Sequence, residues 1–586
     1  MNASAHDTPG LPTAALRGKL VPWLAGCVLL GMLTLPFLLP YARPPFTSFH
    51  QEWLAVAAGL AVFTLLVLVR PGWSFSIPHV TILPVALATL IAAQSVFGKT
   101  AYWQQGALAS LILVWAAAMI AVGNNLRRAW GWERFAALCA AGLAAGALLN
   151  AAIAMVQLSG WFPAGWVVRI DGTRLYGNLA QPNHFANHVF LGLISLGYLA
   201  MTRRLLPWIA VPLALPMLLA LALAGSRSVW LYFAVAIALA AWFGWRANDA
   251  RIRRLAVAAV LALVACIVLS LPWASAGGEA PAVPESALAR MQSGDGAFGI
   301  RLHLWQAALE MFRASPLTGV GFGQYAWQHF LLADRLPAVA SAGLTDHAHN
   351  LFLHLMAELG IVGLPIVVAG VFWWLRRQDW RSPAPERWWL GTVLSVLAVH
   401  SLLEYPLWYA YFLAVFALLA GAGAAGAWQL PAGGRVLIRG TMVAAAWLML
   451  IQIGWDYRRV ESLAGRPAAE VQQDIAELHR GSLLSHVVEL GIVTAMPIDA
   501  ERSRDKLMLS GRVLRWIPAG ELAFRHSMLL ALSGDVISAK AFWDRSMLAY
   551  PGEVSAALKL LRDIPSPRSS AVDELLEYAA SRGRES

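Results

Sequence analysis

The stretch from Thr345 to Gly360 reads TDHAHNLFLHLMAELG and places three histidines at the edge of an apolar run. His349 directly precedes Asn350 and this run, which predicts a position at the start of a helix. The positive potential of a helix start favours a neutral imidazole, and a neutral imidazole is what a general base requires. We therefore expect His349 to act as a base, with His347 as a neighbour whose role stays open.

Zinc is the alternative that the histidines raise. No pair among His347, His349 and His354 has the i, i+4 spacing of a zinc-binding helix, and no glutamate completes an HExxH motif. The spacing therefore disfavours a metal site. His354 lies inside the apolar run, where we expect a hydrogen-bonded core histidine.

Two arginines have the chemistry to bind an anion. Arg301 stands in GIRLHLWQAALEM, at the predicted start of an amphipathic helix, where a cation opposes the helix dipole. An anionic ligand shared by the arginine and the helix start would reverse that penalty. Arg227 stands in AGSRSVWLYF, where two apolar runs meet in a short turn. The alternative for Arg227 is an interfacial or helix-capping side chain.

Further polar groups flank apolar runs in RLYGNLAQPNH and HSLLEYPLWYAYF. They are ordinary loop and interface residue types, and only their convergence with the arginines favours a functional role. The side chains that we expect to position a substrate or an acceptor are Arg174, Asn178, Gln181, Asn183, His347, Glu404 and Tyr405.

These groups need a scaffold, and the composition indicates a membrane. The 586 residues are 59% hydrophobic and 13% charged, which predicts an all-α polytopic helix bundle. About thirteen apolar runs are long enough to span a bilayer. They lie near 20–40, 53–69, 78–97, 106–123, 133–158, 184–201, 205–224, 229–245, 255–273, 351–375, 388–403, 408–427 and 436–455. The three cysteines lie inside apolar runs and suggest no disulfide framework.

The net charge of +11 is explained by topology, so no nucleic acid partner is expected. With the amino terminus in the cytoplasm, the arginine-rich short loops all fall on the cytoplasmic side. This orientation predicts a cytoplasmic amino terminus (1–18), an amino-terminal bundle (19–273), a large periplasmic loop with short helices (274–350), a second bundle (351–456) and a periplasmic tail (457–586).

The tail is charged and amphipathic. Within it, ELAFRHSMLLALSGDVISAKAFWDRSMLAYP predicts two helices around a Gly-Asp turn, similar to a tetratricopeptide hairpin. A helical cap and a docking surface for a protein substrate are both compatible with this pattern. Arg458 and Arg459, just after the last span, argue weakly against a periplasmic tail.

Five segments of the sequence together resemble the PglL/PilO-type bacterial O-oligosaccharyltransferases. They are RLYGNLAQPNHFANH, GSRSVW, GIRLHLWQAAL, DHAHNLFLHLMAELGIVGL and HSLLEYPLWYAYF. These belong to the superfamily of the O-antigen ligases (WaaL) and O-antigen polymerases (Wzy). The resemblance implies transfer of a glycan from undecaprenyl pyrophosphate to Ser or Thr of a periplasmic protein such as pilin, at the bacterial inner membrane, without metal, nucleotide sugar or other cofactor.

The resemblance also assigns roles. It places the essential histidine at His349, the pyrophosphate-associated arginines at Arg227 and Arg301, and further functional residues at Gln181 and Tyr405. A single displacement by the acceptor hydroxyl would invert the anomeric centre.

Two rivals remain at this stage. An O-antigen ligase or polymerase would use the same histidine and arginines on a lipid A core or glycan acceptor. A lipid or solute transporter would need polar groups near mid-span and repeated halves, whereas the polar groups here gather at the ends of the runs.

Overall fold

The computed structural model is almost entirely helical in the part of the chain that it describes. The described residues are 13–68, 75–160, 165–169, 174–274, 297–336, 345–378, 384–430, 436–463, 466, 468–565 and 569–582. Within them the only strands are β1 (Phe75–Pro78) and β2 (Ala427–Leu430), which pair antiparallel. The predicted all-α class is confirmed.

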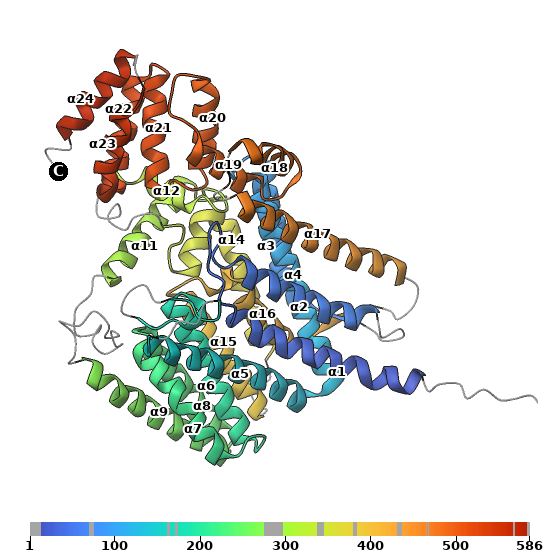
Figure 1. Cartoon of the computed structure of the whole chain (residues 1–586). Coiled ribbons are helices and arrows are strands. Elements are labelled where there is room, and N and C mark those ends of the chain that lie inside the picture. The colour runs from blue at the N-terminus through green and yellow to red at the C-terminus, as the bar shows by residue number, and fades with distance from the viewer. Residues whose placement is uncertain are drawn as a thin grey trace, which may run out of the picture.

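A bundle of long apolar helices forms the body of the protein (Figure 1). Each predicted span overlaps one helix. The helices are α1 (Thr13–Thr34), α2 (Phe49–Leu68), α3 (Ile82–Val96), α4 (Trp103–Trp130), α5 (Trp132–Leu158), α6 (Pro182–Met201), α7 (Pro207–Leu223), α8 (Ser228–Arg246), α9 (Ala250–Ala274), α14 (Leu351–Arg376), α15 (Pro385–Ser401), α16 (Ala410–Gly423) and α17 (Val436–Leu463). Among the described residues, 8 helices are long and apolar enough to cross a membrane. The protein is a multi-pass membrane protein.

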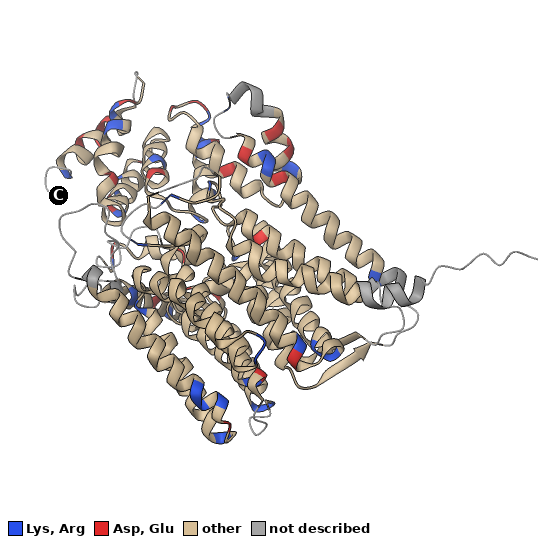
Figure 2. Cartoon of the chain, turned by 60° about the horizontal axis from the view of Figure 1, so that its bottom comes forward, with Lys and Arg blue, Asp and Glu red and all other residues tan. Residues whose placement is uncertain are grey.

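Small residues let the helices approach closely. A Cβ on Gly123 of α4 would lie 1.9 Å from the carbonyl oxygen of Leu418 in α16, and a Cβ on Gly421 would lie equally close, 1.9 Å, to that of Ile120. Such contact between backbones replaces the hydrophobic driving force that lipid tails cannot supply between helices. Figure 2 shows the charged residues mainly at the helix ends and in the tail. The spans therefore position polar groups at the two ends of the bundle.

The remaining helices connect these long helices or form the tail. The helices are α11 (Ala297–Ala314), α12 (Tyr325–Leu331), α18 (Ala468–Gly481), α19 (Ser485–Ala495), α20 (Ser503–Leu514), α21 (Gly520–Leu532), α22 (Val536–Ala549), α23 (Val554–Arg562) and α24 (Ser570–Arg582). The short 3-10 turns are η1 (Leu35–Phe37), η2 (His79–Thr81), η3 (Gly177–Leu179), η4 (Pro406–Trp408) and η5 (Pro551–Glu553).

The tail packs on the segment that contains α11 and α12 (Figure 1). Phe330 and Ala333, which follow the start of α12, belong to the same buried apolar cluster as the tail helices. Arg545 of α22 pairs with Asp334 at 2.9 Å, and Tyr102, between α3 and α4, donates to Glu489 of α19 at 2.6 Å. The tail and the segment 297–336 therefore lie at the same end of the bundle.

One helix runs across the predicted junction between bundle and tail. α17 continues without a break to Leu463, beyond the boundary expected at 456. Arg459 lies in this extension and pairs with Asp474 at 3.0 Å and Glu477 at 2.8 Å, both on α18. Acidic partners in the tail offset this charge, so Arg459 carries little weight as a topology signal.

The predicted tail hairpin is confirmed. α21 and α22 are joined through Gly534, whose φ of +92° requires a glycine-like conformation. Asp535 then caps α22 by accepting from the Ser538 amide at 3.0 Å. The Gly-Asp pair ends one helix and starts the next, as its residue types indicate.

Trp543 of α22 is fully buried at 0% exposure in the tail core. Replacing Trp543 with alanine is expected to destabilise the tail by about 3–5 kcal/mol, because a large cavity would remain. Limited proteolysis of the purified protein measures this as faster cleavage within 468–582. Ile537→Ala on the same helix, where the side chain is 80% exposed, is the matched control. Equal cleavage of the two variants would contradict the prediction.

Candidate active site

The buried carboxylate of Glu404 contacts three residues that are far apart in the sequence. Its Oε1 accepts from Arg301 Nη2 at 2.6 Å and from Asn183 Nδ2 at 2.7 Å, and its Oε2 lies 2.9 Å from His349 Nδ1. The Glu404 side chain is only 2% exposed. Three segments, before α14, in α11 and in α6, thus meet at the short connection between α15 and α16.

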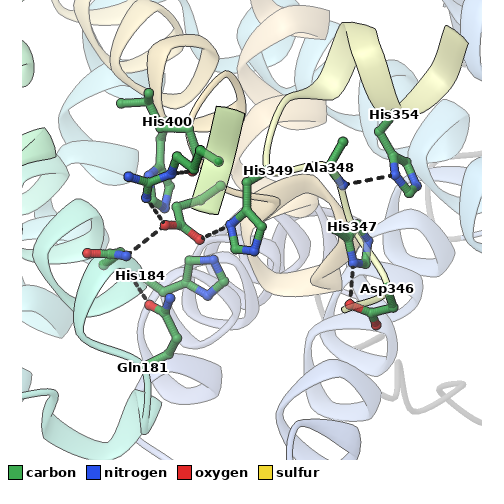
Figure 3. A network of polar contacts seen from close by, with 12 residues as sticks. Gln181, His184, Asp346, His347, Ala348, His349, His354 and His400 are labelled. Carbon is green, nitrogen blue, oxygen red and sulfur yellow. Dashed lines mark hydrogen bonds and ion pairs between the residues drawn. The ribbon is translucent and has the colours of Figure 1, made fainter. Parts of the chain in front are cut away.

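His349 occupies the residue before the cap of α14, as predicted. Asn350 caps the helix by accepting from the Leu353 amide at 3.2 Å, and His349 itself has a φ of +50°. A left-handed conformation is unfavourable for a residue with a side chain, and such positions concentrate at functional sites. The turn directs the imidazole to Glu404, and the side chain remains 25% exposed (Figure 3). His349 is therefore both held and accessible.

Arg301 lies in the second turn of α11 and reaches the connection between α15 and α16. Its Nε donates to the Leu403 carbonyl at 3.2 Å, beside the ion pair with Glu404. Within the chain, Arg301 therefore binds the carboxylate of Glu404, which lies on the connection between α15 and α16. The guanidinium has five N–H groups and its side chain is 21% exposed, which leaves donors for a second anion.

The segment before and within α6 supports the same carboxylate. Asn183 donates to Glu404 and accepts from Arg174 Nη2 at 3.1 Å. Gln181 caps α6 by accepting from the His184 amide at 2.5 Å, and Pro182 occupies the first helical turn. Gln181 therefore fixes the start of the helix that presents Asn183.

Asn178 bonds to the backbone of neighbouring loops. Its amide donates to the carbonyls of Leu38 at 2.8 Å and Trp166 at 2.9 Å, and its oxygen accepts from the Val168 amide at 3.0 Å. All three of these side-chain bonds go to backbone groups, because the amide NH₂ and carbonyl match unpaired groups of neighbouring loops. Asn178 thus ties these loops together, and its role in positioning a substrate stays a prediction.

Tyr405 stacks against the histidine loop. Its ring lies 4.2 Å from that of His347 with an interplanar angle of 9°, and it meets His349 edge-on at 5.2 Å. Burial raises the pKa of Tyr405 to about 12, so the phenol is a neutral donor near pH 7. Burial also lowers the pKa of His347, against the opposing effect of Asp346. Tyr405 thus packs between the two histidines.

His354 is a core residue, as predicted. It is 3% exposed, its Nε2 lies 3.4 Å from Glu358 Oε2, and its Nδ1 accepts from the Ala348 amide at 3.4 Å. In the part of the chain that the structure describes, no group of three or more His, Cys, Asp or Glu side chains has the arrangement of a metal site.

Arg227 stands directly before α8, in the cap position, and is half-buried. Three residues earlier, the carbonyl of Ala224 accepts from Arg174 Nε at 3.1 Å, and Arg174 also holds Asn183. One turn into α8, the Tyr232 hydroxyl lies 2.7 Å from His400 Nδ1 of α15. The turn carrying Arg227 is thereby attached to both sides of the Glu404 network.

Comparisons with known proteins cover this same region. The family profile of the O-antigen ligases matches residues 212–368, which include Arg227, Arg301 and His349. Residues 212–368 thus match the O-antigen ligase family. A profile described as virulence factor membrane-bound polymerase, C-terminal, matches residues 388–563, which include Glu404, Tyr405 and most of the tail. This agrees with the resemblance seen in the sequence motifs.

Two curated relatives narrow the type of enzyme within the superfamily. The chain is 27% identical to a general O-oligosaccharyltransferase of Acinetobacter baylyi over 449 residues, which is 74% of this chain and 76% of that protein. It is 33% identical over 129 residues to the exopolysaccharide production protein ExoQ of Rhizobium meliloti, covering 21% of this chain and 30% of that protein. The chain is thus an enzyme of the glycosyltransferase type, with oligosaccharyltransferase or ligase activity.

Sequence reasoning missed the central place of Glu404 and three buried neighbours. His184 of α6 packs 5.3 Å from His400 and 5.6 Å from Tyr405, measured between ring centroids, and His400 bonds to Tyr232. The available signal was the presence of polar and aromatic residues at the ends of apolar runs. That signal does not tell which of these residues meet.

The Glu404 carboxyl gives the site a pH dependence. Burial raises its pKa, but the hydrogen bond from His349 and the nearby charge of Arg301 outweigh burial and lower the pKa from 4.5 to about 2. Because the pKa is depressed in the folded protein, ionised Glu404 stabilises the fold above pH 4.5, and this contribution is lost as the pH falls toward 2.

The unfolding temperature of the purified protein is expected to fall between pH 4.5 and 2. This fall should be smaller in the Glu404→Gln variant, which has no carboxyl group to protonate at this position. Glu577→Gln, which removes an exposed acid of α24, is the control for a general acid effect. Identical pH dependence in the parent and Glu404→Gln proteins would contradict the assignment.

Proposed function

We propose that this enzyme transfers an oligosaccharide from undecaprenyl pyrophosphate to a Ser or Thr hydroxyl of a periplasmic protein such as pilin. The observation that carries the proposal is the contact of His349, Arg301 and Asn183 with one buried carboxylate. A base and a fixed cation side by side suit a reaction in which a hydroxyl attacks while an anionic group leaves.

In this mechanism His349 is the general base. Its Nδ1–H donates to Glu404, which fixes the tautomer and leaves the lone pair of Nε2 for the acceptor hydroxyl. The hydroxyl oxygen forms a bond to the anomeric carbon as its proton passes to Nε2. The bond from the anomeric carbon to the phosphate oxygen breaks, and its electron pair stays on the pyrophosphate. This single displacement inverts the anomeric centre.

Arg301 and Arg227 neutralise the pyrophosphate as it leaves. Guanidinium groups bind phosphate oxygens through paired donors and stay charged throughout the reaction. Arg301 is already fixed by Leu403 and Glu404, so it needs little reorganisation. In this proposal the arginines supply the charge that a divalent ion supplies in other glycosyltransferases, without metal or cofactor.

Tyr405, Asn183 and Gln181 act around this centre. Tyr405 contacts both histidines, so its neutral hydroxyl is placed to orient the first sugar or the acceptor. The tail at the same end of the bundle supports a protein acceptor, because it offers a soluble surface beside the site. In the proposed orientation, the end of the bundle that carries the site and the tail lies on the periplasmic side of the inner membrane.

The second candidate function is an O-antigen ligase or polymerase, which the family profiles over 212–368 and 388–563 favour. The acceptor distinguishes the two candidates. Deletion of the gene should remove glycan mass from pilin-like proteins and leave the lipopolysaccharide ladder intact. The reverse result would establish a ligase in place of a protein-glycosylating enzyme.

A further inference from the structure

A second polar cavity lies at the opposite end of the bundle from His349. It has a volume of about 230 Å³ and is lined by the guanidinium residues Arg127, Arg377 and Arg387 together with Trp132, Gln378 and the turn Gly423 to Gly426. These residues come from the end of α4, the start of α5, the end of α14, the start of α15 and the turn after α16. Five elements therefore converge on one basic hollow.

The cavity collects positive charge without a carboxylate among its lining residues. Two acids that neighbour lining residues have other partners: Glu386, next to Arg387, accepts from Tyr198 at 3.1 Å, and Glu133, next to Trp132, lies 3.5 Å from Arg204. The Nε of Arg127 is buried and has no hydrogen-bond partner among the described residues. A buried guanidinium donor without an acceptor is costly, and a bound anion would satisfy it.

Membrane topology explains part of this charge, because arginines gather on the cytoplasmic side of such proteins. Helix dipoles explain a further part, since Arg127 lies in the last turn of α4 and Arg377 caps the end of α14. The helix dipole does not account for Arg387, which lies in the first turn of α15, where the dipole opposes a cation. An anion at that helix start would be bound by both the dipole and Arg387.

We propose that this cavity binds the phosphate headgroup of an anionic glycerophospholipid. Its volume is smaller than the roughly 300 Å³ at which typical ligand pockets begin, which suits a headgroup better than a nucleotide. Trp132 and Leu390 line the same cavity and provide an apolar border for the lipid at the level of the helix ends. Basic pockets between membrane helices on this side are recurrent sites for anionic lipids.

The test uses the full-length protein purified in neutral detergent, with native mass spectrometry and thermal unfolding. Phosphatidylglycerol should bind and raise the unfolding temperature, whereas phosphatidylcholine should not. The double variant Arg127→Gln, Arg387→Gln should bind phosphatidylglycerol at least about tenfold more weakly. If the double variant does not fold, the single variant Arg387→Gln replaces it. This single variant should show an intermediate loss of affinity for phosphatidylglycerol.

The matched control is Arg246→Gln, Arg254→Gln, which removes the same charge from exposed positions near the α8 to α9 connection. It should bind phosphatidylglycerol within about twofold of the parent protein. Equal loss in the control would show a general charge effect and overturn the site. Equal stabilisation by phosphatidylcholine would overturn the requirement for an anion, and full stabilisation by inorganic phosphate alone would replace the lipid with free phosphate.

Discussion

Replacing His349 with alanine should lower the rate of glycan transfer from a defined lipid-linked donor to a pilin peptide by at least about 10²–10⁴-fold. The variant loses the proton acceptor for the attacking hydroxyl. Glu404 keeps its bonds from Arg301 at 2.6 Å and Asn183 at 2.7 Å, so the fold and donor binding should survive. Purified protein in liposomes, with transfer followed by mass spectrometry, measures the rate.

His347→Phe is the comparison that separates the two histidines of the loop. Phenylalanine preserves the stacking on Tyr405 at a ring distance of 4.2 Å and removes only the ring nitrogens. This variant should retain most of the transfer activity. A loss as large as that of His349→Ala would move the base to His347, and full activity of His349→Ala would refute the proposed mechanism.

Glu404→Gln should have the second largest effect, a decrease of kcat by about 10²–10⁴-fold with little change in KM. The new amide oxygen can still accept from Arg301 and Asn183, which leaves the amide NH₂ facing His349 Nδ1. The imidazole must then accept at Nδ1 and carry its proton on Nε2. The nitrogen that faces the acceptor is protonated and cannot act as a base.

Two further measurements define the role of Glu404. NMR of the imidazole nitrogens should show the change of tautomer at His349, which a purely structural role of Glu404 would not produce. Arg204→Ala, which breaks the half-exposed pair with Glu133 at 3.5 Å, controls for loss of an ion pair and should leave kcat unchanged. A Glu404→Gln protein with parental kcat would show that Glu404 does not set the His349 tautomer.

Much of the fold could be predicted from residue patterns. Each apolar run long enough to span a bilayer became a helix, because a backbone in hydrocarbon must satisfy its own hydrogen bonds. The turn at Gly534 and Asp535 was also predictable, since both residue types favour one local conformation. The end of α17 at Leu463 was not, because its extension is fixed by the pairing of Arg459 with α18.

The candidate site residues were recognisable by type and by their place at the ends of apolar runs. His349, Arg301, Asn183 and Tyr405 were all named on that basis, and the structure places them around one centre. Asn178 has the same residue type and a similar place in the sequence, yet its amide bonds to three loop backbones. Residue type alone does not distinguish the two outcomes.

The sequence by itself thus determined the membrane-spanning helices, the end of each helix at which polar groups lie, and the chemical groups available there. Hydropathy and helix-end preferences are local properties, and they act wherever the chain carries them. Only the tertiary structure decided that Glu404 is shared by His349, Arg301 and Asn183. These residues lie on separate segments, and the packing of the helices that carry them brings them to one carboxylate.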